Sequence, residues 1–218
     1  GPWIQPEQSM QKVVFSEIEA AGPRHLEVRL PQPETVAGYY RDIAVLAFPS
    51  PGPYRIENIR GKAAFEIGHA GGRGKEPPAG SAIQQAQIVD LSSRMDPAGR
   101  LVWDVPAGRW TVVRFGHTST GVQNAPAPAS GRGLECDKLS PEGVEANFRG
   151  MMARLIAGAG PAAGKTLVAT HVDSWENGSQ NWTARMREEF RKRRGYDLLP
   201  FLPVLTGRVV DGLDISER

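Results

Sequence analysis

The sequence lacks several features that would point to particular classes of protein. It holds a single cysteine, Cys136, in 218 residues, so no internal disulfide framework can form. No apolar run approaches the roughly 20 residues that a membrane-spanning helix needs, and no signal peptide is visible. The charges nearly cancel at a net +2, so no strong field favours nucleic acid or an anionic membrane. We therefore expect a globular protein whose partner is neither a nucleic acid nor a membrane.

The two ends also lack the features of natural termini. The chain begins Gly1-Pro2-Trp3 without an initiator methionine, and the last four residues, ISER, close no element of structure. We expect a segment from inside a longer protein, for which missing targeting signals carry no information.

The first 120 residues contain two apolar patterns. Four apolar residues recur at helical spacing within residues 6–20 and predict a helix that ends at Gly22. They are Met10, Val13, Val14 and Ile18. Between residues 25 and 120, short alternating runs predict strands, and the Pro-Ala-Gly turn at 106–108 predicts a hairpin. Such runs, without helical patterns between them, are typical of an antiparallel sheet or a small sandwich.

A different alternation follows the Pro/Ala/Gly-rich linker at residues 121–133. Ser140-Pro141-Glu142 carries the residues of a helix start, and apolar residues at helical spacing continue to Ile156. Residues 166–173 predict a buried strand, and residues 184–194 predict a helix that Gly195 ends. Helix, strand and helix in this order are typical of parallel α/β units.

The predicted fold class is therefore α/β, as part of a (β/α)8 TIM-like barrel that carries an inserted antiparallel β-rich segment. Residues 1–22 would supply a barrel helix segment, and residues 23–121 the β-rich insertion. Residues 122–218 would form partial (β/α) barrel units with the candidate active-site loop, because barrel enzymes keep their chemistry where strands end.

That loop lies in the stretch TLVATHVDSWENGSQNWT, residues 166–183. In an extended strand His171 and Asp173 share one face at its carboxyl end. Further acidic, aromatic and amide side chains follow: Trp175, Glu176, Gln180, Asn181 and Trp182. Carboxylates beside rings and amides suit sugar recognition, and glycosidic cleavage needs a proton donor and a second carboxylate. The alternative, that Asp173 and Glu176 only cap the loop and the next helix, stays open.

A second acidic cluster, Glu135 and Asp137, enters the same region from the linker. These carboxylates could line the same cleft, bind a cation through their oxygens, or be solvated.

Two other motifs resemble binding sites, but their contexts favour a structural role. The sequence AGPAAGKT at residues 159–166 follows a helix instead of a strand, unlike a phosphate-binding loop. The run RKRR at residues 191–194 complements a helix dipole and does not require nucleic acid.

Five segments resemble family 106 of the glycoside hydrolases, the α-L-rhamnosidases of bacterial pectin and plant-glycan breakdown. They are GPWIQPEQSMQKVVFSE, LPQP with YYRDIAVLAFP, GRWTVVRFGHTSTG, GLECDKLS, and DSWENGSQNWTARMREEFRKRRGYDLLPFLPVLTGRVV. They follow one another in order and cover nearly all 218 residues. The last is long enough to carry the resemblance alone.

The resemblance implies a long, multidomain, periplasmic or extracellular enzyme with a catalytic barrel. It implies inverting hydrolysis of terminal α-L-rhamnose in a rhamnose-containing oligo- or polysaccharide, with Ca2+ near the sugar. Glu176 matches as general acid, with Asp173 and Glu135 as substrate contacts and Asp137 as a calcium contact. The partner carboxylate would lie beyond Arg218. The alternative is a non-catalytic carbohydrate-binding module that uses the tryptophan-rich loop.

Overall fold

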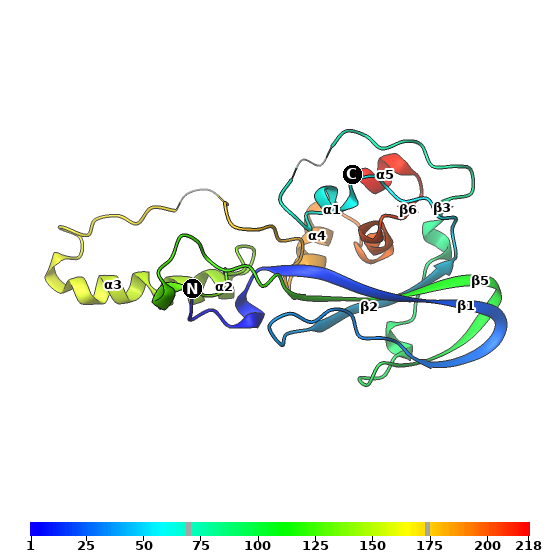
Figure 1. The fold of residues 1–218 in the computed structure, drawn as a ribbon, viewed down its shortest axis with the longest axis horizontal. Coiled ribbons are helices and arrows are strands. Elements are labelled where there is room, and N and C mark those ends of the chain that lie inside the picture. The colour runs from blue at the N-terminus through cyan, green and yellow to red at the C-terminus, as the bar shows by residue number, and fades with distance from the viewer. Residues whose placement is uncertain (69–70, 173–174) are drawn as a thin grey trace.

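The centre of the molecule is a four-stranded antiparallel sheet (Figure 1). The computed structural model describes residues 1–68, 71–172 and 175–218. The strands lie in the order β1 (Gln11–Arg29), β5 (Arg100–Ser119), β2 (Arg41–Pro49) and β4 (Val89–Asp90). A separate short parallel pair joins β3 (Ala82–Ile83) to β6 (Val209–Val210). The fold is thus mixed α/β, with long strands and short helices.

The helices are α1 (Ile59–Lys62), α2 (Pro141–Gly150), α3 (Met152–Ala159), α4 (Met186–Arg194) and α5 (Leu213–Glu217). Among the described residues, 3-10 turns accompany them at Pro6–Gln8, Gln85–Gln87, Ser92–Arg94, Ala129–Gly131, Gly160–Ala162 and Leu199–Thr206. Figure 1 shows α1, α5 and the last 3-10 turn over one face of the sheet, while α2 and α3 form an arm along the long axis. Every helix in the described part of the chain is too short or too polar to span a bilayer.

Strand β1 occupies the place of the predicted N-terminal helix, so that prediction is wrong. It pairs with β5 from Gln11 opposite Ser119 to Arg29 opposite Arg100. Val13 enters one hydrophobic cluster and Ala20 the cluster on the other face of the sheet. A strand that is buried on both faces carries apolar residues at odd and at even positions. In this sequence their spacing resembles the pattern of an amphipathic helix, which explains the wrong prediction. The predicted boundary after residue 22 falls inside this strand.

The predicted hairpin at residues 106–108 is also absent, because β5 runs through it as one strand. The pairing with β1 shifts between Gly22 and Arg24, which marks a bulge opposite Val105 and Gly108. A Cβ at Gly22 would lie 2.0 Å from the carbonyl oxygen of Pro106, so only glycine fits there. The proline and glycine signals therefore mark a bend in two paired strands.

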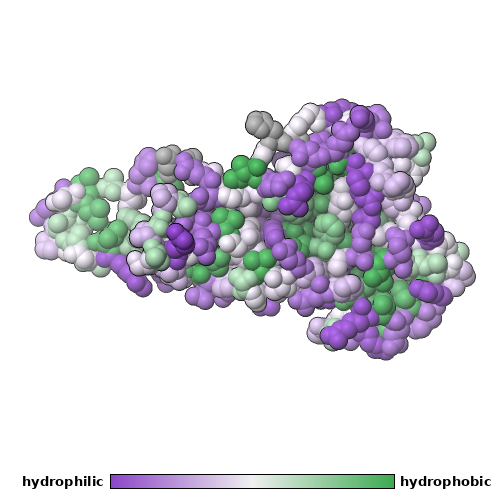
Figure 2. Space-filling model, viewed as in Figure 1, coloured by the Kyte–Doolittle hydropathy of each residue, from purple (hydrophilic) through white to green (hydrophobic). Residues whose placement is uncertain are grey.

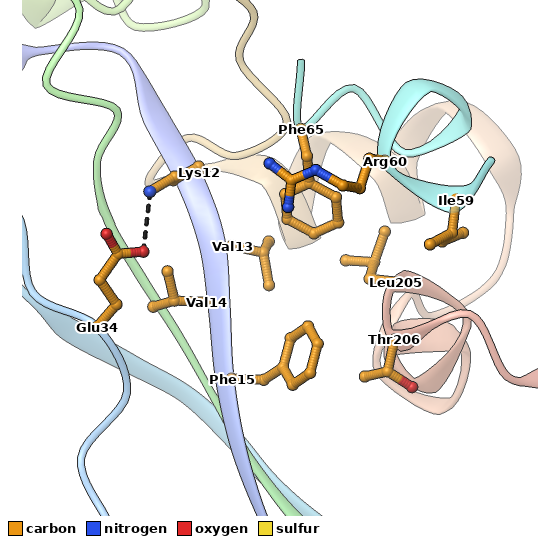
Figure 3. Close-up of a pocket in the computed structure, with 10 residues that line it drawn as sticks. All are labelled: Lys12, Val13, Val14, Phe15, Glu34, Ile59, Arg60, Phe65, Leu205 and Thr206. Atoms are coloured by element: carbon orange, nitrogen blue, oxygen red, sulfur yellow. Dashed lines mark hydrogen bonds and ion pairs between the residues drawn. The ribbon is translucent and has the colours of Figure 1, made fainter. Parts of the chain in front are cut away.

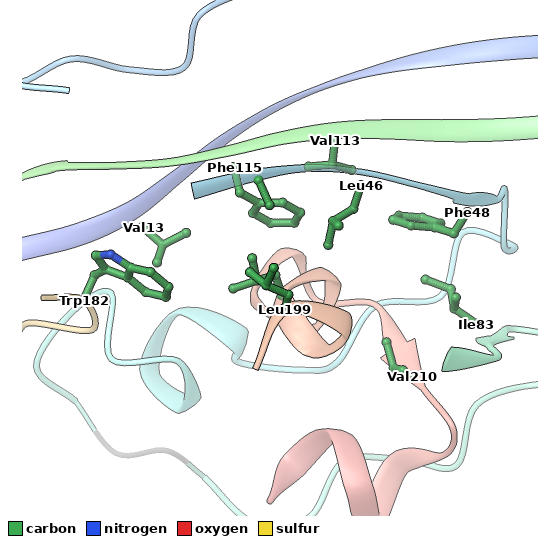
Figure 4. Close-up of a cluster of buried hydrophobic side chains, with 11 residues drawn as sticks. Val13, Leu46, Phe48, Ile83, Val113, Phe115, Trp182, Leu199 and Val210 are labelled. Carbon is green, nitrogen blue, oxygen red and sulfur yellow. The ribbon is translucent and has the colours of Figure 1, made fainter. Parts of the chain in front are cut away.

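The two faces of the sheet carry separate hydrophobic clusters. Figure 4 shows the first, in which Leu46, Phe48, Val113 and Phe115 of the sheet face Leu199 from the C-terminal segment. The second lies on the opposite face and consists of Ala20, Leu26, Leu30, Val45, Ala47, Leu91, Leu101, Trp103, Val105 and Val112. The first cluster explains why the proline-broken segment near residue 200 is apolar: it forms a 3-10 turn that covers the sheet.

The arm confirms the helix predicted after Ser140, whose Oγ accepts a hydrogen bond from the amide of Gly143. A break at Met151 separates α2 from α3. The apolar stripe of this arm is exposed, with Val144 at 50%, Phe148 at 43% and Leu155 at 52% (Figure 2). The stripe therefore lacks a packing partner within the described residues.

Residues 166–172 do not form the predicted buried strand. Leu167 makes only an isolated bridge to Ala163, and Val168 and Val172 are 71% and 91% exposed. A strand needs a neighbour for its backbone hydrogen bonds, and the described residues supply none here. Helix α4 forms as predicted and ends at Gly195, whose φ is +80°. A barrel is not seen in the described residues.

His117 generates a prediction about pH. The ring is 7% exposed, its Nδ1 lies 3.2 Å from Oε1 of Gln11, and it packs against Tyr39 and Trp182. Burial, with Arg41 adding to it, lowers the pKa of His117 from 6.5 to about 4. Between pH 6.5 and about 4, His117 is therefore mostly protonated in the unfolded chain and mostly neutral in the folded chain. We expect the free energy of unfolding to fall as pH drops from 6.5 to about 4, by at most about 3 kcal/mol.

Urea denaturation of the chain across this pH range checks the expectation. The variant His117→Gln should remove most of the slope, whereas His25→Gln, which changes an exposed histidine, should keep it. An unchanged slope in His117→Gln would assign the pH dependence to other groups.

Candidate functional site

The candidate loop, residues 175–183, is attached to the free edge of β1. The amides of Asn181 and Trp182 donate to the carbonyl oxygen of Gln11 at 3.2 and 3.3 Å. The Asn181 side chain accepts from the amide of Val13 at 2.8 Å and donates to the carbonyl oxygen of Ala63 at 2.8 Å. These bonds satisfy backbone groups that an edge strand would otherwise leave open. Asn181, predicted as a sugar contact, thus ties the loop to the sheet.

Trp182 extends this attachment into the core. Its side chain is 5% exposed and belongs to the first hydrophobic cluster with Val13 and Leu199, as Figure 4 shows. The ring lies 6.1 Å from that of His117 between centroids. A ring buried in this way stabilises the loop and offers no free face for stacking on a sugar.

Asp137 is the centre of a buried polar network beneath the loop. It is 2% exposed, and its Oδ1 accepts from the amide of Leu139 at 2.9 Å and from Nε2 of Gln180. Its Oδ2 accepts from the hydroxyl of Thr183 at 2.7 Å. Nε2 of Gln180 also donates to the carbonyl oxygen of Trp182 at 2.9 Å. The network joins the linker region to the loop, about 45 residues apart along the chain.

Calcium does not fit these residues at Asp137. A calcium ion needs six to eight oxygen ligands, whereas N–H and O–H donors surround this carboxylate. The Oε1 of Gln180 is buried and has no hydrogen-bond partner, but a single amide oxygen beside one carboxylate does not make such a set. Within residues 1–68, 71–172 and 175–218, no three His, Cys, Asp or Glu side chains converge as metal ligands.

A second group of side chains joins the start of the loop to the linker region. Nζ of Lys138 lies 2.8 Å from Oε2 of Glu135 and 5.1 Å from the centroid of the Trp175 ring. Trp175 is 42% exposed, and Glu176 beside it is exposed as well. Lys138 therefore brings Glu135 and Trp175 together, next to the predicted acid.

Two predicted residues remain. His171 is exposed, and Asp173 lies outside the described residues. Two residues that sequence reasoning missed, Lys138 and Thr183, connect the predicted ones. The Asn177-Gly178 pair is the signal that could have indicated a turn in this loop. The φ of Gly178 is +67°, and a Cβ there would lie 2.8 Å from the Val122 side chain.

A pocket of about 390 Å³ lies along β1, on the part of the strand to which the loop is attached (Figure 3). Its wall combines the ion pair of Lys12 with Glu34, at 2.9 Å, and the rings of Phe15 and Phe65. Phe15 is 38% exposed. Charged groups beside partly exposed rings are what a sugar needs for hydrogen bonds and stacking. Val13, which binds Asn181, belongs to the same wall.

An exposed carboxylate beside an exposed tryptophan, as at Glu176 and Trp175, is typical of proteins that act on carbohydrates. The model of glycoside hydrolase family 106, described as alpha-L-rhamnosidase, matches residues 1–52 and 50–218. The chain therefore belongs to that family.

Two similar proteins are longer than this chain, which matches only part of each. A protein of Formosa agariphila with the provisional name of a beta-glucuronidase is 41% identical over 221 residues, which cover 100% of this chain and 19% of that protein. The structure of a rhamnosidase from Novosphingobium sp. PP1Y matches with a TM-score of 0.80 at 22% identity, over 99% of this chain and 34% of that one. The second match shows a shared fold. The chain spans about a fifth of the length of the first relative.

The Asp137 network generates a prediction about stability. Asp137→Asn removes the negative charge that three donors share and places an amide hydrogen against one of them. We expect the free energy of unfolding to fall by about 2 kcal/mol, as for other buried hydrogen bonds to charged groups. Urea denaturation measures the loss. Asp104→Asn is the matched control, because its side chain is 83% exposed, and it should change stability by less than about 0.5 kcal/mol. Equal losses in both variants would contradict the role given to Asp137.

Proposed function

We propose that the whole polypeptide containing this chain is an inverting glycoside hydrolase that removes terminal α-L-rhamnose from plant or pectic glycans. The observation that supports it is the family match over nearly the whole chain, which includes the DSWE segment with its exposed Glu176. In this proposal Glu176 is the general acid, and a second carboxylate outside this chain activates water.

The proposed chemistry divides between the two carboxyl groups. Protonated Glu176 gives its proton to the glycosidic oxygen as the bond to the anomeric carbon breaks, and the second carboxylate takes a proton from the attacking water. Trp175, half exposed beside Glu176, would stack on a sugar face. The bonds of Asn181 to Val13 and Ala63 hold the loop against β1 while its acidic part projects.

The proposal also includes the fold around the site, the metal and the location of the enzyme. In the whole polypeptide, the arm of α2 and α3 and residues 166–172 would pack into a (β/α)8 barrel, which would cover the exposed apolar stripe. Calcium near the sugar and a periplasmic or extracellular location remain parts of the proposal that rest on the family resemblance. No calcium ligand set is assigned within this chain.

A second candidate activity is β-glucuronide hydrolysis. It is favoured by the provisional name of the relative that is 41% identical over the whole of this chain. Both activities need an acid at the leaving oxygen, so Glu176 keeps its role in either. A third candidate, a carbohydrate-binding module without catalysis, would use Trp175 and the pocket beside β1.

The decisive experiment assays the whole polypeptide on aryl α-L-rhamnosides and aryl β-D-glucuronides, with and without Glu176→Gln. Loss of a general acid should lower kcat by about 10²–10⁴-fold on a poor leaving group such as 4-methylphenol. A 2,4-dinitrophenyl glycoside should be affected much less, because its leaving group needs no proton. A merely structural role for Glu176 would lower both rates alike.

The matched control is Glu145→Gln, which changes an exposed glutamate of α2 that pairs with Arg149. It should leave both rates unchanged. Full activity of Glu176→Gln on both leaving groups would remove Glu176 from the mechanism. Binding of rhamnosides or glucuronides without any turnover would favour the binding module.

A further inference from the structure

A second pocket, of about 440 Å³, lies beside the middle of β1, further along the strand than the candidate loop. Its wall includes Glu19 of β1, residues 50–53, Arg55 and Arg109 of β5. Glu19 is six residues beyond Val13, and an extended strand rises about 3.3 Å per residue, so the two regions are roughly 20 Å apart. The proposed hydrolytic reaction uses none of these side chains.

Three arginines converge on this pocket: Arg55, Arg109 and Arg208. Arg208 is 3% exposed, and its two terminal nitrogens lie 2.8 and 3.0 Å from the carboxylate oxygens of Glu17. Its Nε is buried and has no hydrogen-bond partner. Arg109 lies 3.6 Å from Glu19. With two glutamates against three arginines, the pocket has one positive charge in excess.

Arg55 carries that excess charge. Its guanidinium donates only to backbone carbonyl oxygens, those of Gly52 at 3.3 Å and Tyr54 at 2.8 Å, and meets no carboxylate among the described residues. Burial and then the charge of Arg208 lower the pKa of Arg55 from its ordinary value, against smaller opposing effects of Glu17 and Glu19. A guanidinium that is repelled by a neighbouring arginine and forms no ion pair of its own gains by binding an anion.

The backbone builds this arrangement. The amide of Ile56 donates to the carbonyl oxygen of Gly207 at 2.7 Å, which fixes Arg55 beside Arg208. Gly207 has a φ of +83°, and a Cβ on it would lie 3.3 Å from the aliphatic carbons of Arg55. The stem of Arg55 therefore lies over a position without a side chain. Two segments about 150 residues apart along the chain hold the arginines together.

Hydroxyl groups complete the wall. Ser50 and Thr111 lie 2.9 Å apart and each donates to a different oxygen of Glu19, also at 2.9 Å. Their protons are used inside this triad, and Ser50, which is partly exposed while Thr111 is buried, keeps an acceptor lone pair on the pocket wall. An acceptor hydroxyl near a guanidinium without an ion pair suits a molecule that carries both an anionic group and hydroxyl groups.

We propose that this pocket binds a saccharide through a singly charged oxyanion, either a carboxylate or a sulfate ester, held by Arg55 and Arg109. The single excess positive charge matches a monoanion, and the fork of a guanidinium matches two oxygens of one group. The saccharide part rests on the proposed function, because it follows from membership of a glycoside hydrolase family. The site lies apart from Glu176, so it binds an anionic part of a glycan without cleaving it.

Isothermal titration of the whole polypeptide at low salt tests the proposal with three probes: methyl β-D-glucuronide, glucose 6-sulfate and neutral methyl β-D-glucoside. We expect at least one anionic sugar to bind, and binding to weaken as salt rises. Arg55→Gln should weaken it about tenfold, which is the effect of losing one charged hydrogen bond. The control Arg24→Gln removes an exposed arginine of β1 that lies outside the pocket, and it should leave binding unchanged. Binding of the glucuronide alone assigns a carboxylate, and binding of the sulfate alone assigns a sulfate ester.

Three outcomes overturn the proposal. They are equal binding of the neutral glucoside, unchanged binding in Arg55→Gln with its fold intact by thermal unfolding, and free acetate or sulfate binding as tightly as the sugars, which would mean an adventitious ion only. The titration needs no turnover, so it decides this site even if the polypeptide hydrolyses none of the aryl glycosides. Arg55→Gln should also leave kcat on those substrates unchanged.

Discussion

The pairing of β1 with β5 is the constraint on which the rest of the structure depends. These strands stay hydrogen-bonded from Gln11 and Ser119 to Arg29 and Arg100, with one bulge at Gly22. Because both faces of the paired strands are buried, each strand supplies side chains to two hydrophobic clusters at once. The C-terminal segment packs on this sheet through the first cluster, where Leu199 and Leu202 join Phe48 and Phe115. Its ion pair from Arg208 to Glu17 adds a direct link to β1. Loss of the pairing would therefore remove the surface on which this segment packs.

The same strand positions both regions to which we assign a function. Near its start, Gln11 and Val13 take the hydrogen bonds of the loop. Further along, Glu17 and Glu19 hold Arg208 and Arg109 at the second pocket. As an edge strand, β1 has backbone groups on its outer side that no other strand among the described residues pairs with. Loop residues use these backbone groups and the arginines use the glutamate side chains, which explains why both regions lie along it.

The sequence allowed some of this structure to be predicted, and the failures have a common physical cause. Several local signals were reliable: the capping Ser140, the end of α4 at Gly195 and the strand at residues 41–49 all formed. The strand predicted at residues 61–68 did not form, because helix α1 and turns occupy that place. Predictions failed where long-range pairing decided the outcome, as in β1, whose apolar residues serve two faces, and in β5, whose Pro-Gly signal marks a bulge. In the site, the residue types predicted a carbohydrate-active loop. The spatial order of Asp137, Lys138 and Thr183 could not be predicted, because it depends on contacts about 40 residues apart.

The anchoring of the loop also changes how Glu176 is positioned. The sequence suggested that a buried strand before it would deliver the acid to the site, as in an α/β barrel. In the structure, residues 166–172 have no ladder partner among the described residues, whereas the residues after Glu176 are firmly held. Asn181 binds β1, Trp182 enters the core, and Thr183 reaches Asp137. The position of the proposed acid therefore depends on these contacts on its C-terminal side, together with the contact of Lys138 with the preceding Trp175. It follows that substitutions in the buried network can disturb the acid without touching it, and that packing of residues 166–172 would add a second restraint.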